Sequence, residues 1–394
     1  MSTPEVFVIS ALRTAIGSFG GALKDVPPIE LATQASRAAL LSSGIEPASV
    51  GHVVMGHVIP TEVHDAYLSR VVALQAGLGK ETPAFNVNRL CGSGLQAIVS
   101  GAQSLLLGDA DAVLTGGVES MSRGAYLMPQ ARWGARMGDI QAVDYMLGVL
   151  HDPFESIHMG ITAENIAAHY GISRQTQDEL AVTSQKRAAR ATVEGRFNSQ
   201  IVPIEMRSRR GLTTFAVDEH VRSETTVEQL GKMKPAFQAD GSVTAGNASG
   251  LNDGAAALVM ASGDTVRQQG LKPIARLVAY AHVGVEPAMM GLGPIPATRL
   301  ALKRAGLTVA DLDVIESNEA FAAQACAVSR ELNLDPDKVN PNGSAIALGH
   351  PVGATGAIIA TKAIHELHRI QGRYALVTMC IGGGQGIAVI FERV

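Results

Sequence analysis

Apolar and polar positions along the chain follow the same order twice. Each copy begins with a short apolar run, continues through a helical pattern that stops at a glycine, and reaches a second apolar run after a polar stretch. The first copy comprises residues 6–9, 37–44 and 52–55, and the second comprises residues 275–278, 299–306 and 314–315. Short apolar runs predict buried strands, and apolar residues spaced by three and four before a glycine predict a helix.

The repeat continues downstream, and its two copies differ at one place. In each copy a glycine-rich turn with a helical pattern is followed by an apolar run, at residues 112–115 in the first and 375–378 in the second. A final apolar run, 386–391, follows closely in the second copy. Its counterpart, 254–259, comes roughly 140 residues after the preceding run, as read from the alignment of the repeats. We therefore expect an insertion near residues 119–249.

This organisation predicts an α/β protein with two duplicated halves that face each other and an inserted, loop-rich domain. Strands that alternate with helices indicate βαβ units and largely parallel, buried sheets. The expected domains are residues 1–118 with 250–270, the insert at 119–249, and residues 271–394. The alternative is chance similarity among helices rich in Ala and Gly, which the recurrence of the whole element order disfavours.

Composition narrows the functional classes. Apolar residues make up 46% of the 394 residues and charged residues 17%, which is ample material for a buried core. Few aromatic residues and a net charge of −4 disfavour a nucleic-acid surface. Three cysteines do not indicate a disulfide framework, and we find neither a signal peptide nor an apolar run of about 18 residues. We therefore expect a cytoplasmic protein that does not enter a membrane.

The clearest candidate for chemistry in the first half is Cys91, in the segment NRLCGSGLQA at residues 88–97. It follows a predicted strand and precedes a helical run. The positive end of a helix dipole favours a thiolate, and the neighbouring glycines allow a ligand to approach the backbone. The alternative is a buried cysteine that acts as a small apolar residue.

Three further candidates lie in the second half, at the same edge of the predicted sheets. His350, in GHPVGATG, occupies the turn that matches Cys91, so we expect it to face that residue. Cys380 ends an apolar run and precedes three glycines, and Asn318 follows the run at 314–315, where α/β sites form. The alternatives are a turn histidine with its hydrogen bonds satisfied and an inert cysteine. Cys326 lies inside a helical pattern, and we interpret it as a core residue.

Several other chemistries lack their motifs. The sequence contains no Walker loop, no HExxH and no paired CxxC, and the glycines at 382–386 lead into a strand and not into a helix. We therefore expect no metal. The insert is rich in basic residues, which form either a solvated face or a polyphosphate site. These residues are Lys186, Arg187, Arg190, Arg196, Arg207, Arg209, Arg210 and Arg222.

From residue 6 to its C-terminus the chain resembles the thiolase family, in particular its bacterial acetyl-CoA acetyltransferase and β-ketothiolase branch. The resemblance rests on seven motifs in order: NRLCGSGLQA, GGVESMS, HMGITAEN, TAGNASGLNDGAAA, NEAFAAQA, GHPVGATGA and CIGGGQG. It implies a duplicated α/β core, layered α/β/α/β/α, with an inserted loop domain. It also implies reversible condensation of acetyl-CoA with an acyl-CoA to a 3-ketoacyl-CoA, through an acyl-cysteine.

The resemblance assigns a role to each candidate. Cys91 would carry the acyl group, His350 would activate it and help to hold the thioester oxygen, and Cys380 would move the α-proton. Asn318 would hold a water in one oxyanion hole, and the N–H groups of Cys91 and Gly382 would form the other. Condensation needs a base over the α-carbon and donors over the oxygen, so this division of roles is chemically sound.

The resemblance also implies that coenzyme A is a substrate, with no tightly bound cofactor. The expected CoA contacts are Leu150, His158, Met159, Arg222, Phe237, Ala245, Ser249, Ala320 and Phe321. The chain departs from the family after Arg222, where Gln229 replaces a frequent Ser and Met-Lys-Pro at 233–235 replaces Leu-Arg-Pro.

Two other functions fit the fold. One is a decarboxylating condensing enzyme that acts on acyl-carrier protein, but such enzymes lack a second catalytic cysteine, and Cys380 is present. The other is a non-catalytic acyl-CoA or lipid-binding relative, which would have lost one of the four reactive groups. The segment 126–138 resembles β-ketothiolases that accept acyl groups slightly longer than acetyl. Since family members are dimers or tetramers, we expect a homotetramer, a dimer of dimers.

Overall fold

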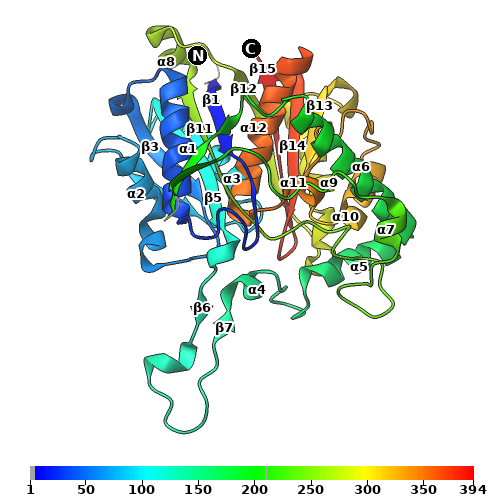
Figure 1. Ribbon diagram of the computed structural model, residues 1–394. Helices are drawn as coiled ribbons and strands as arrows, with labels where there is room; N and C mark the ends of the chain where they lie inside the picture. Colours follow the sequence, from blue (N-terminus) through cyan, green and yellow to red (C-terminus); the bar gives the residue numbers. More distant parts are fainter. Residues whose placement is uncertain (1–4, 209–210) are drawn as a thin grey trace.

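The computed structural model describes residues 5–208 and 211–394, and its strands form one large sheet and two small hairpins (Figure 1). The large sheet has the order β13-β14-β15-β12-β1-β11-β5-β3-β4, with β2 and β8 attached to β11 and β1. Its strands are β1 (Val6–Thr14), β2 (Gly17–Ser18), β3 (Val50–Gly56), β4 (Ala84–Val87), β5 (Ala112–Ser120), β8 (Ile201–Val202), β11 (Asn252–Ser262), β12 (Ala275–Gly284), β13 (Val314–Ser317), β14 (Tyr374–Ile381) and β15 (Gln385–Arg393). The hairpins are β6 (Tyr126–Leu127) with β7 (Val143–Asp144) and β9 (Ile204–Ser208) with β10 (Gly211–Phe215).

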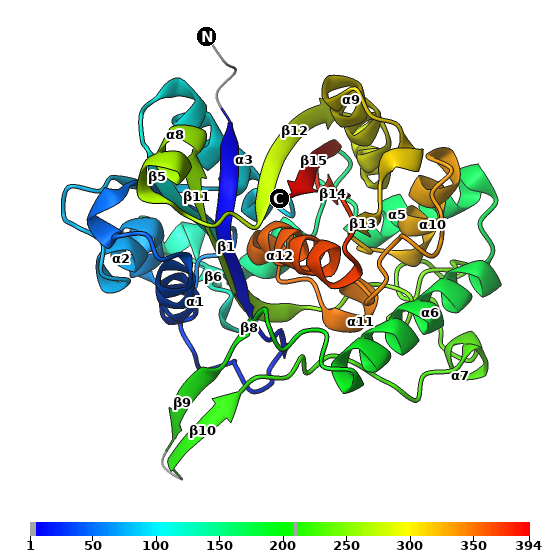
Figure 2. The same ribbon diagram turned by 90° about the horizontal axis from the view of Figure 1, so that it is seen from above.

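The helices complete a layered arrangement. They are α1 (Pro28–Ser43), α2 (Leu68–Gln75), α3 (Ser93–Leu107), α4 (Tyr145–Val149), α5 (Met159–Tyr170), α6 (Arg174–Val193), α7 (Val227–Gly231), α8 (Gly263–Gln269), α9 (Pro294–Ala305), α10 (Ala322–Glu331), α11 (Ala345–Leu348) and α12 (Val352–Ile370). Helix α12 packs against α3 and contacts strands of both halves, whereas α1 and α9 each cover the outer face of one half (Figure 2). The α/β/α/β/α layering expected from the sequence is therefore confirmed.

The expectation of largely parallel sheets is wrong, because the sheet is mixed. β3 pairs in parallel with β4 and β5, and β13 with β14, but the pairings around β11 and β15 are antiparallel. β14 and β15 are joined by a turn too short for a crossover connection, so they form an antiparallel hairpin. β5 and β11 pair in the same way, although the whole insert lies between them.

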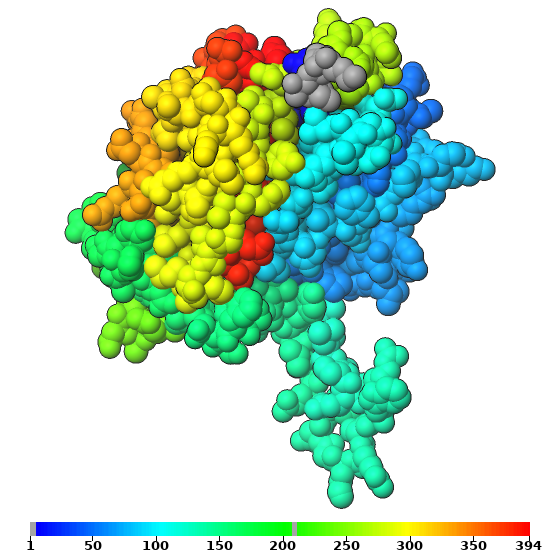
Figure 3. All heavy atoms as spheres, turned by 180° about the vertical axis from the view of Figure 1, so that it is seen from behind, coloured from blue at the N-terminus to red at the C-terminus, as the bar shows by residue number. Residues whose placement is uncertain are grey.

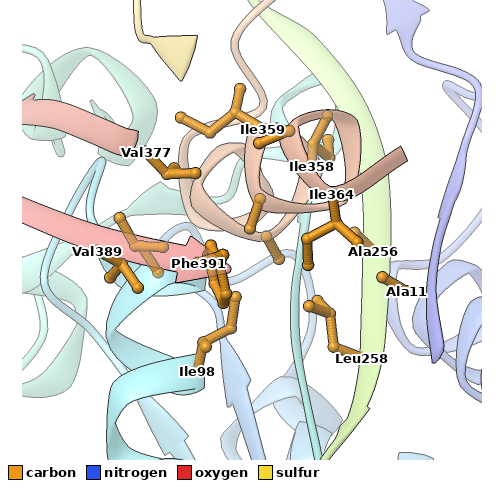
Figure 4. Packing of buried hydrophobic residues seen from close by; sticks show 14 of the residues in the cluster. Ala11, Ile98, Ala256, Leu258, Ile358, Ile359, Ile364, Val377, Val389 and Phe391 are labelled. Carbon is orange, nitrogen blue, oxygen red and sulfur yellow. The ribbon is translucent and has the colours of Figure 1, made fainter. Parts of the chain in front are cut away.

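Small residues let the two central helices approach closely. A Cβ atom at Gly94 of α3 would lie 2.7 Å from the backbone nitrogen of Ala357, and one at Gly356 of α12 would lie 2.3 Å from that of Leu95. Apolar side chains then fill the space between these helices and the strands, among them Ile98, Ile358 and Phe391 (Figure 4). Part of the large number of Gly and Ala residues thus serves the contact between the two halves.

One helical segment, Leu90–Leu107, is long and apolar enough to cross a membrane by length and composition. The segment is 61% buried inside the protein, and α3 packs against β3, β5 and α12. A buried core helix has the same length and composition as a membrane-spanning one.

The chain between β5 and β11 leaves the core and covers one end of it. The β6–β7 hairpin and its loop project from the body as an arm, and α5, α6 and α7 lie beside the second half (Figures 1 and 3). Three arginines of the basic stretch attach α6 and the segment after it to the second half: Arg187 donates to the carbonyls of Val339 and Pro336, Arg190 to that of Pro341, and Arg196 to Asn342. Those three charges are structural, and Arg209 and Arg210 lie outside the described residues.

Candidate active site

One cavity of about 450 Å³ collects most of the residues expected from the sequence. Its lining includes three of the catalytic candidates, Cys91, His350 and Cys380, together with Gly382. It also includes eight of the nine expected CoA contacts, namely Leu150, His158, Met159, Phe237, Ala245, Ser249, Ala320 and Phe321. Asn318 and Arg222 are not part of this lining.

Cys91 lies in the loop between β4 and α3, one residue before the N-cap Gly92. The loop is held by Ser93, whose hydroxyl accepts from the Arg89 N–H and donates to the Leu90 carbonyl, while Leu90 takes a positive φ of 45°. Burial raises the pKa of the Cys91 thiol to about 11, although the N–H groups of Gly382 and Cys91 itself lower it. The expected thiolate is therefore not the resting form, because desolvation outweighs the helix terminus.

His350 lies just before α12, and its ring is fixed by the same helix. Its backbone N–H donates to the side-chain oxygen of Asn252, and its Nδ1 lies 2.6 Å from the hydroxyl of Thr355. Because the Thr355 hydroxyl donates to the Pro351 carbonyl, it accepts from Nδ1–H. Burial lowers the pKa of His350 to about 4, so the ring is neutral near pH 7 and its Nε2 is free to accept a proton.

Cys380 lies on β14 directly opposite Gly386 of β15, where the hairpin turn begins. Gly383 and Gly384 take positive φ values of 77° and 81° in this turn, which suits glycine. Burial, and then the proximity of Cys91, raise the pKa of the Cys380 thiol. The two thiols are thus neighbours, and both are neutral near pH 7.

Asn318 follows β13, and its backbone N–H donates to the Thr378 carbonyl of β14. The side chain is fully buried, and within the described residues neither its oxygen nor its nitrogen has a hydrogen-bond partner. It lines a small cavity of about 10 Å³ together with Thr355 and Lys362. An unpaired buried amide costs about 1–3 kcal/mol, so Asn318 is a ready partner for a water or a substrate oxygen.

Aromatic and apolar side chains form the wall of the main cavity on the side of the insert. The ring of Phe237 stacks on His158 with a centroid distance of 4.6 Å and meets Phe321 edge to face. Nδ1 of His158 accepts from the Gly160 N–H, which fixes its ring at the start of α5. Such a wall suits the apolar part of an elongated ligand.

Arg222 is exposed, and its guanidinium donates to the backbone carbonyls of Glu219 and Val221. The cavity also has lining residues that the sequence analysis missed: Leu90, Met121, Leu147, Val149, His220, Ala236, Ala248, Gly250, Leu251, Met290 and Val352. Six of these, Leu90, Met121, Ala248, Gly250, Leu251 and Val352, lie within motifs quoted above. The other five, Leu147, Val149, His220, Ala236 and Met290, lie outside those motifs.

Cys326, interpreted from the sequence as a core residue, is half-buried and lines a different cavity with Arg187 and Arg330. Burial raises the pKa of its thiol to about 12. Within residues 5–208 and 211–394, no cluster of three or more His, Cys, Asp or Glu side chains could hold a metal ion.

Family models decide the identity of this fold and site. The model described as "Thiolase, N-terminal domain" matches residues 6–264, and the model described as "Thiolase, C-terminal domain" matches residues 271–393. The chain belongs to the thiolase family. The thiolase and acyltransferase function expected from the sequence is therefore confirmed.

Individual thiolases match this one over its full length. A protein named beta-ketothiolase BktB, from Cupriavidus necator, is 62% identical over 100% of both chains. An acetyl-CoA acetyltransferase from Chromobacterium violaceum is 48% identical over 99% of this chain and 100% of its own. The crystal structure of human mitochondrial 3-ketoacyl-CoA thiolase has a TM-score of 0.98 with 46% identity and covers 100% of both chains. A structure of that human enzyme in complex with CoA has a TM-score of 0.97.

Proposed function

We propose that this thiolase condenses acetyl-CoA with an acyl-CoA to a 3-ketoacyl-CoA, and catalyses the thiolytic reverse, through an acyl group on Cys91. The observation that carries the proposal is the single cavity in which Cys91, His350 and Cys380 meet below the wall of His158 and Phe237. The name of the Cupriavidus relative, a beta-ketothiolase, supports the same class of substrate. The second cysteine disfavours the decarboxylating alternative.

In the first half-reaction, Cys91 attacks the thioester carbonyl of the acyl-CoA. Its proton passes to Nε2 of His350, which is unprotonated because Nδ1 carries the hydrogen toward Thr355. Since both groups are neutral at rest, the charge separates during attack and no stable ion pair precedes it. The bond between the acyl carbon and the CoA sulfur then breaks, and His350 returns the proton to that sulfur, so that CoA leaves as a thiol and the acyl group remains on Cys91 as a thioester.

In the second half-reaction, the Cys380 thiol passes its own proton to Nε2 of His350, and the resulting thiolate takes a proton from the α-carbon of acetyl-CoA. The carbanion attacks the acyl carbonyl on Cys91, the bond between the acyl carbon and the Cys91 sulfur breaks, and Cys91 regains a proton from His350. The N–H groups of Gly382 and Cys91 point to the Cys91 sulfur, which places them to stabilise the oxyanion that forms there. Asn318, through a bound water, and His350 hold the oxygen of the enolate. The unpaired buried amide of Asn318 supports this assignment.

We propose that the three segments of the chain divide this work. Residues 1–118 with 250–270 carry Cys91, and residues 271–394 carry His350, Cys380 and Asn318. The insert, residues 119–249, supplies Leu150, His158, Met159, Phe237, Ala245 and Ser249 to the cavity wall and so holds CoA, with Arg222 near its nucleotide end. CoA is in this proposal a substrate and product and not a resident cofactor.

The acyl group extends from Cys91 into an apolar pocket of the same cavity. Leu90, Val149 and Leu251 pack, as Cys91 does, against an apolar cluster that contains Met121 and Val352. Apolar walls of this size suit acyl groups slightly longer than acetyl, because each buried methylene contributes about 0.8 kcal/mol. Each of these side chains is therefore a determinant of chain length.

We also propose that the protein is a homotetramer, a dimer of dimers, in the cytoplasm. The arm around β6 and β7 exposes Trp133 and Met137, each to 91%, together with Tyr126 and Met128. β4 lies at the edge of the large sheet, with its outer side free of a partner strand in the described residues. Both features suit contacts between copies of the chain. Three free cysteines suit a reducing compartment.

The test is a series of 3-ketoacyl-CoA substrates of increasing chain length in thiolysis, with kcat/KM for each. We expect turnover of the four-carbon substrate and a maximum at or just above it. Failure to cleave any member of the series would refute the proposed substrate class. A parallel series in Val149→Ala should move the maximum to longer chains if the pocket around Cys91 holds the acyl group.

A further inference from the structure

A group of buried charges lies beside the first turn of α12 and has no place in the mechanism above. It consists of His57, which follows β3, Asp65 in the turn before α2, and Glu119 near the end of β5. Nδ1 of His57 lies 3.2 Å from a carboxylate oxygen of Glu119, and Nε2 lies 3.7 Å from one of Asp65. A histidine between two buried carboxylates is a cation, so the group has one positive and two negative charges.

Glu119 connects this group to the active site. Its carboxylate accepts N–H groups from Val58 and Ile59 and a third, at 2.8 Å, from Gly353 in the first turn of α12. Its negative charge acts on Cys91 and opposes the ionisation of that thiol. Glu119 therefore holds the first turn of α12, the helix that begins after His350, while its charge raises the pKa of the Cys91 thiol.

His57 lies against the Glu119 carboxylate as its counter-charge. Although burial alone would lower it, the pKa of His57 is raised to about 10 by Glu119 and Asp65, so the ring carries a proton near pH 7. The ionisable groups that face His57 are Glu119 and Asp65. Asp65 is fixed in turn by the backbone and hydroxyl of Thr61. Against the effect of burial, the nearby His57 ring and the hydrogen bonds from Thr61 lower the pKa of Asp65 to about 2.

We propose that His57 is a positioning residue of this thiolase, a permanent cation that compensates Glu119 and so keeps the Cys91 thiol reactive. The inference rests on the proposed role of Cys91 as nucleophile. His57 touches neither substrate nor reacting atoms, and it acts through the charge of Glu119. Neutral side chains at position 57 leave that charge uncompensated and make Cys91 harder to ionise.

The experiment measures the rate at which iodoacetamide alkylates Cys91, read on the Cys91 peptide by mass spectrometry. In His57→Gln the rate near pH 7 falls about threefold to tenfold, because a charge in the next layer shifts a pKa by about half a unit to one unit. The double variant His57→Gln with Glu119→Gln returns to within about twofold of wild type, since the uncompensated charge is gone. His64→Gln, exposed and next to Asp65, is the matched control and leaves the rate unchanged.

An unchanged rate in His57→Gln, or a reduced rate that the double variant does not restore, would overturn the inference. If the double variant does not fold, the pH dependence of the alkylation rates tests the inference alone. The wild-type rate divided by the His57→Gln rate should fall toward one between about pH 7 and about pH 10, because wild-type His57 loses its proton over that range. If His57 acted only by packing, this ratio would not change with pH. Preferential alkylation of Cys380 or Cys326 in the wild type would instead contradict Cys91 as the nucleophile, so the two failures are distinguishable.

Discussion

The turn before α3 and the turn before α12 are equivalent in the two halves of the molecule, yet they are held in different ways. The turn with Cys91 is fixed by its own residues, since Ser93 bonds to both Arg89 and Leu90. The turn with His350 is fixed partly by the other half, because Asn252 of β11 accepts its backbone N–H.

This difference shows how a duplicated fold can build one asymmetric site. The first turn is held by hydrogen bonds among its own residues, and the second half contributes the Gly382 N–H, which points to the Cys91 sulfur. The second turn acquires its geometry when the halves pack, through Asn252 and through Glu119, which holds Gly353. Changes at the first turn should therefore remove the chemistry, whereas changes around the second should weaken it by degrees.

Of the variants in the two turns, Cys91→Ser should have the largest effect on activity. We expect thiolysis and condensation to fall by about 10⁴-fold or more, because the acyl carrier is lost. Steady-state assays in both directions measure this. Cys326→Ser is the matched control, since that thiol lies in another cavity, and it should keep its activity. Comparable losses in the two variants would remove Cys91 from its role.

Asn318→Ala should have the next largest effect. One lost oxyanion contact costs about 10²-fold in rate, and that contact is stronger in the transition state than in the ground state. We therefore expect a lower kcat for condensation with a smaller change in KM for acetyl-CoA. A change confined to KM would assign Asn318 to binding.

Thr355→Val sharpens the comparison at the second turn, because it removes the partner of His350 Nδ1 and keeps the shape of the side chain. We expect a loss of about tenfold in the rate at which Cys91 is acylated, since the tautomer of His350 is no longer fixed.

Burial lowers the pKa of His350 to about 4, so the base form of the ring is present above that value and is lost as the pH falls through it. In the wild type, the rate of Cys91 acylation, measured by rapid mixing at a series of pH values, should fall on the acid side with a midpoint near pH 4. A midpoint near the ordinary histidine value of about 6.5 would contradict a buried, neutral ring.

Arg222→Ala should have the smallest effect, because its side chain is exposed and remote from the two turns. We expect a rise of a few-fold, about 1 kcal/mol or less, in KM for CoA with kcat nearly unchanged. The wild-type KM should rise with ionic strength more steeply than that of the variant. Lys186→Ala, another exposed basic residue of the insert, serves as the control. A KM equal to that of wild type at low salt would leave Arg222 as a solvated charge.

The sequence predicted the layers and most of the cavity, because both rest on local patterns. The order of apolar runs identified the two halves, and the glycine-rich motifs located Cys91, His350 and Cys380. It did not predict the antiparallel pairing around β11, which depends on contacts across the insert. It also placed Cys326 in the core, although a helical pattern cannot distinguish a core residue from one that faces a cavity.

The electrostatics of the site were harder to predict. A helix terminus suggested a Cys91 thiolate, but burial raises the pKa of that thiol to about 11. Burial is a property of the assembled halves and not of the CGSG motif. For the same reason the sequence analysis missed His57, whose two carboxylate partners, Asp65 and Glu119, come from separate elements.

The central claim is that the two cysteines perform different steps, and Cys380→Ser tests it most directly. The measurement pairs acetylation of Cys91 by acetyl-CoA, followed by mass spectrometry, with exchange of the acetyl α-protons in D₂O, followed by NMR. Acyl transfer needs no α-proton movement, so we predict that the variant still acetylates Cys91 but exchanges α-protons about 10²-fold or more slowly than wild type. Unchanged exchange in a variant that still acetylates Cys91 would contradict the account.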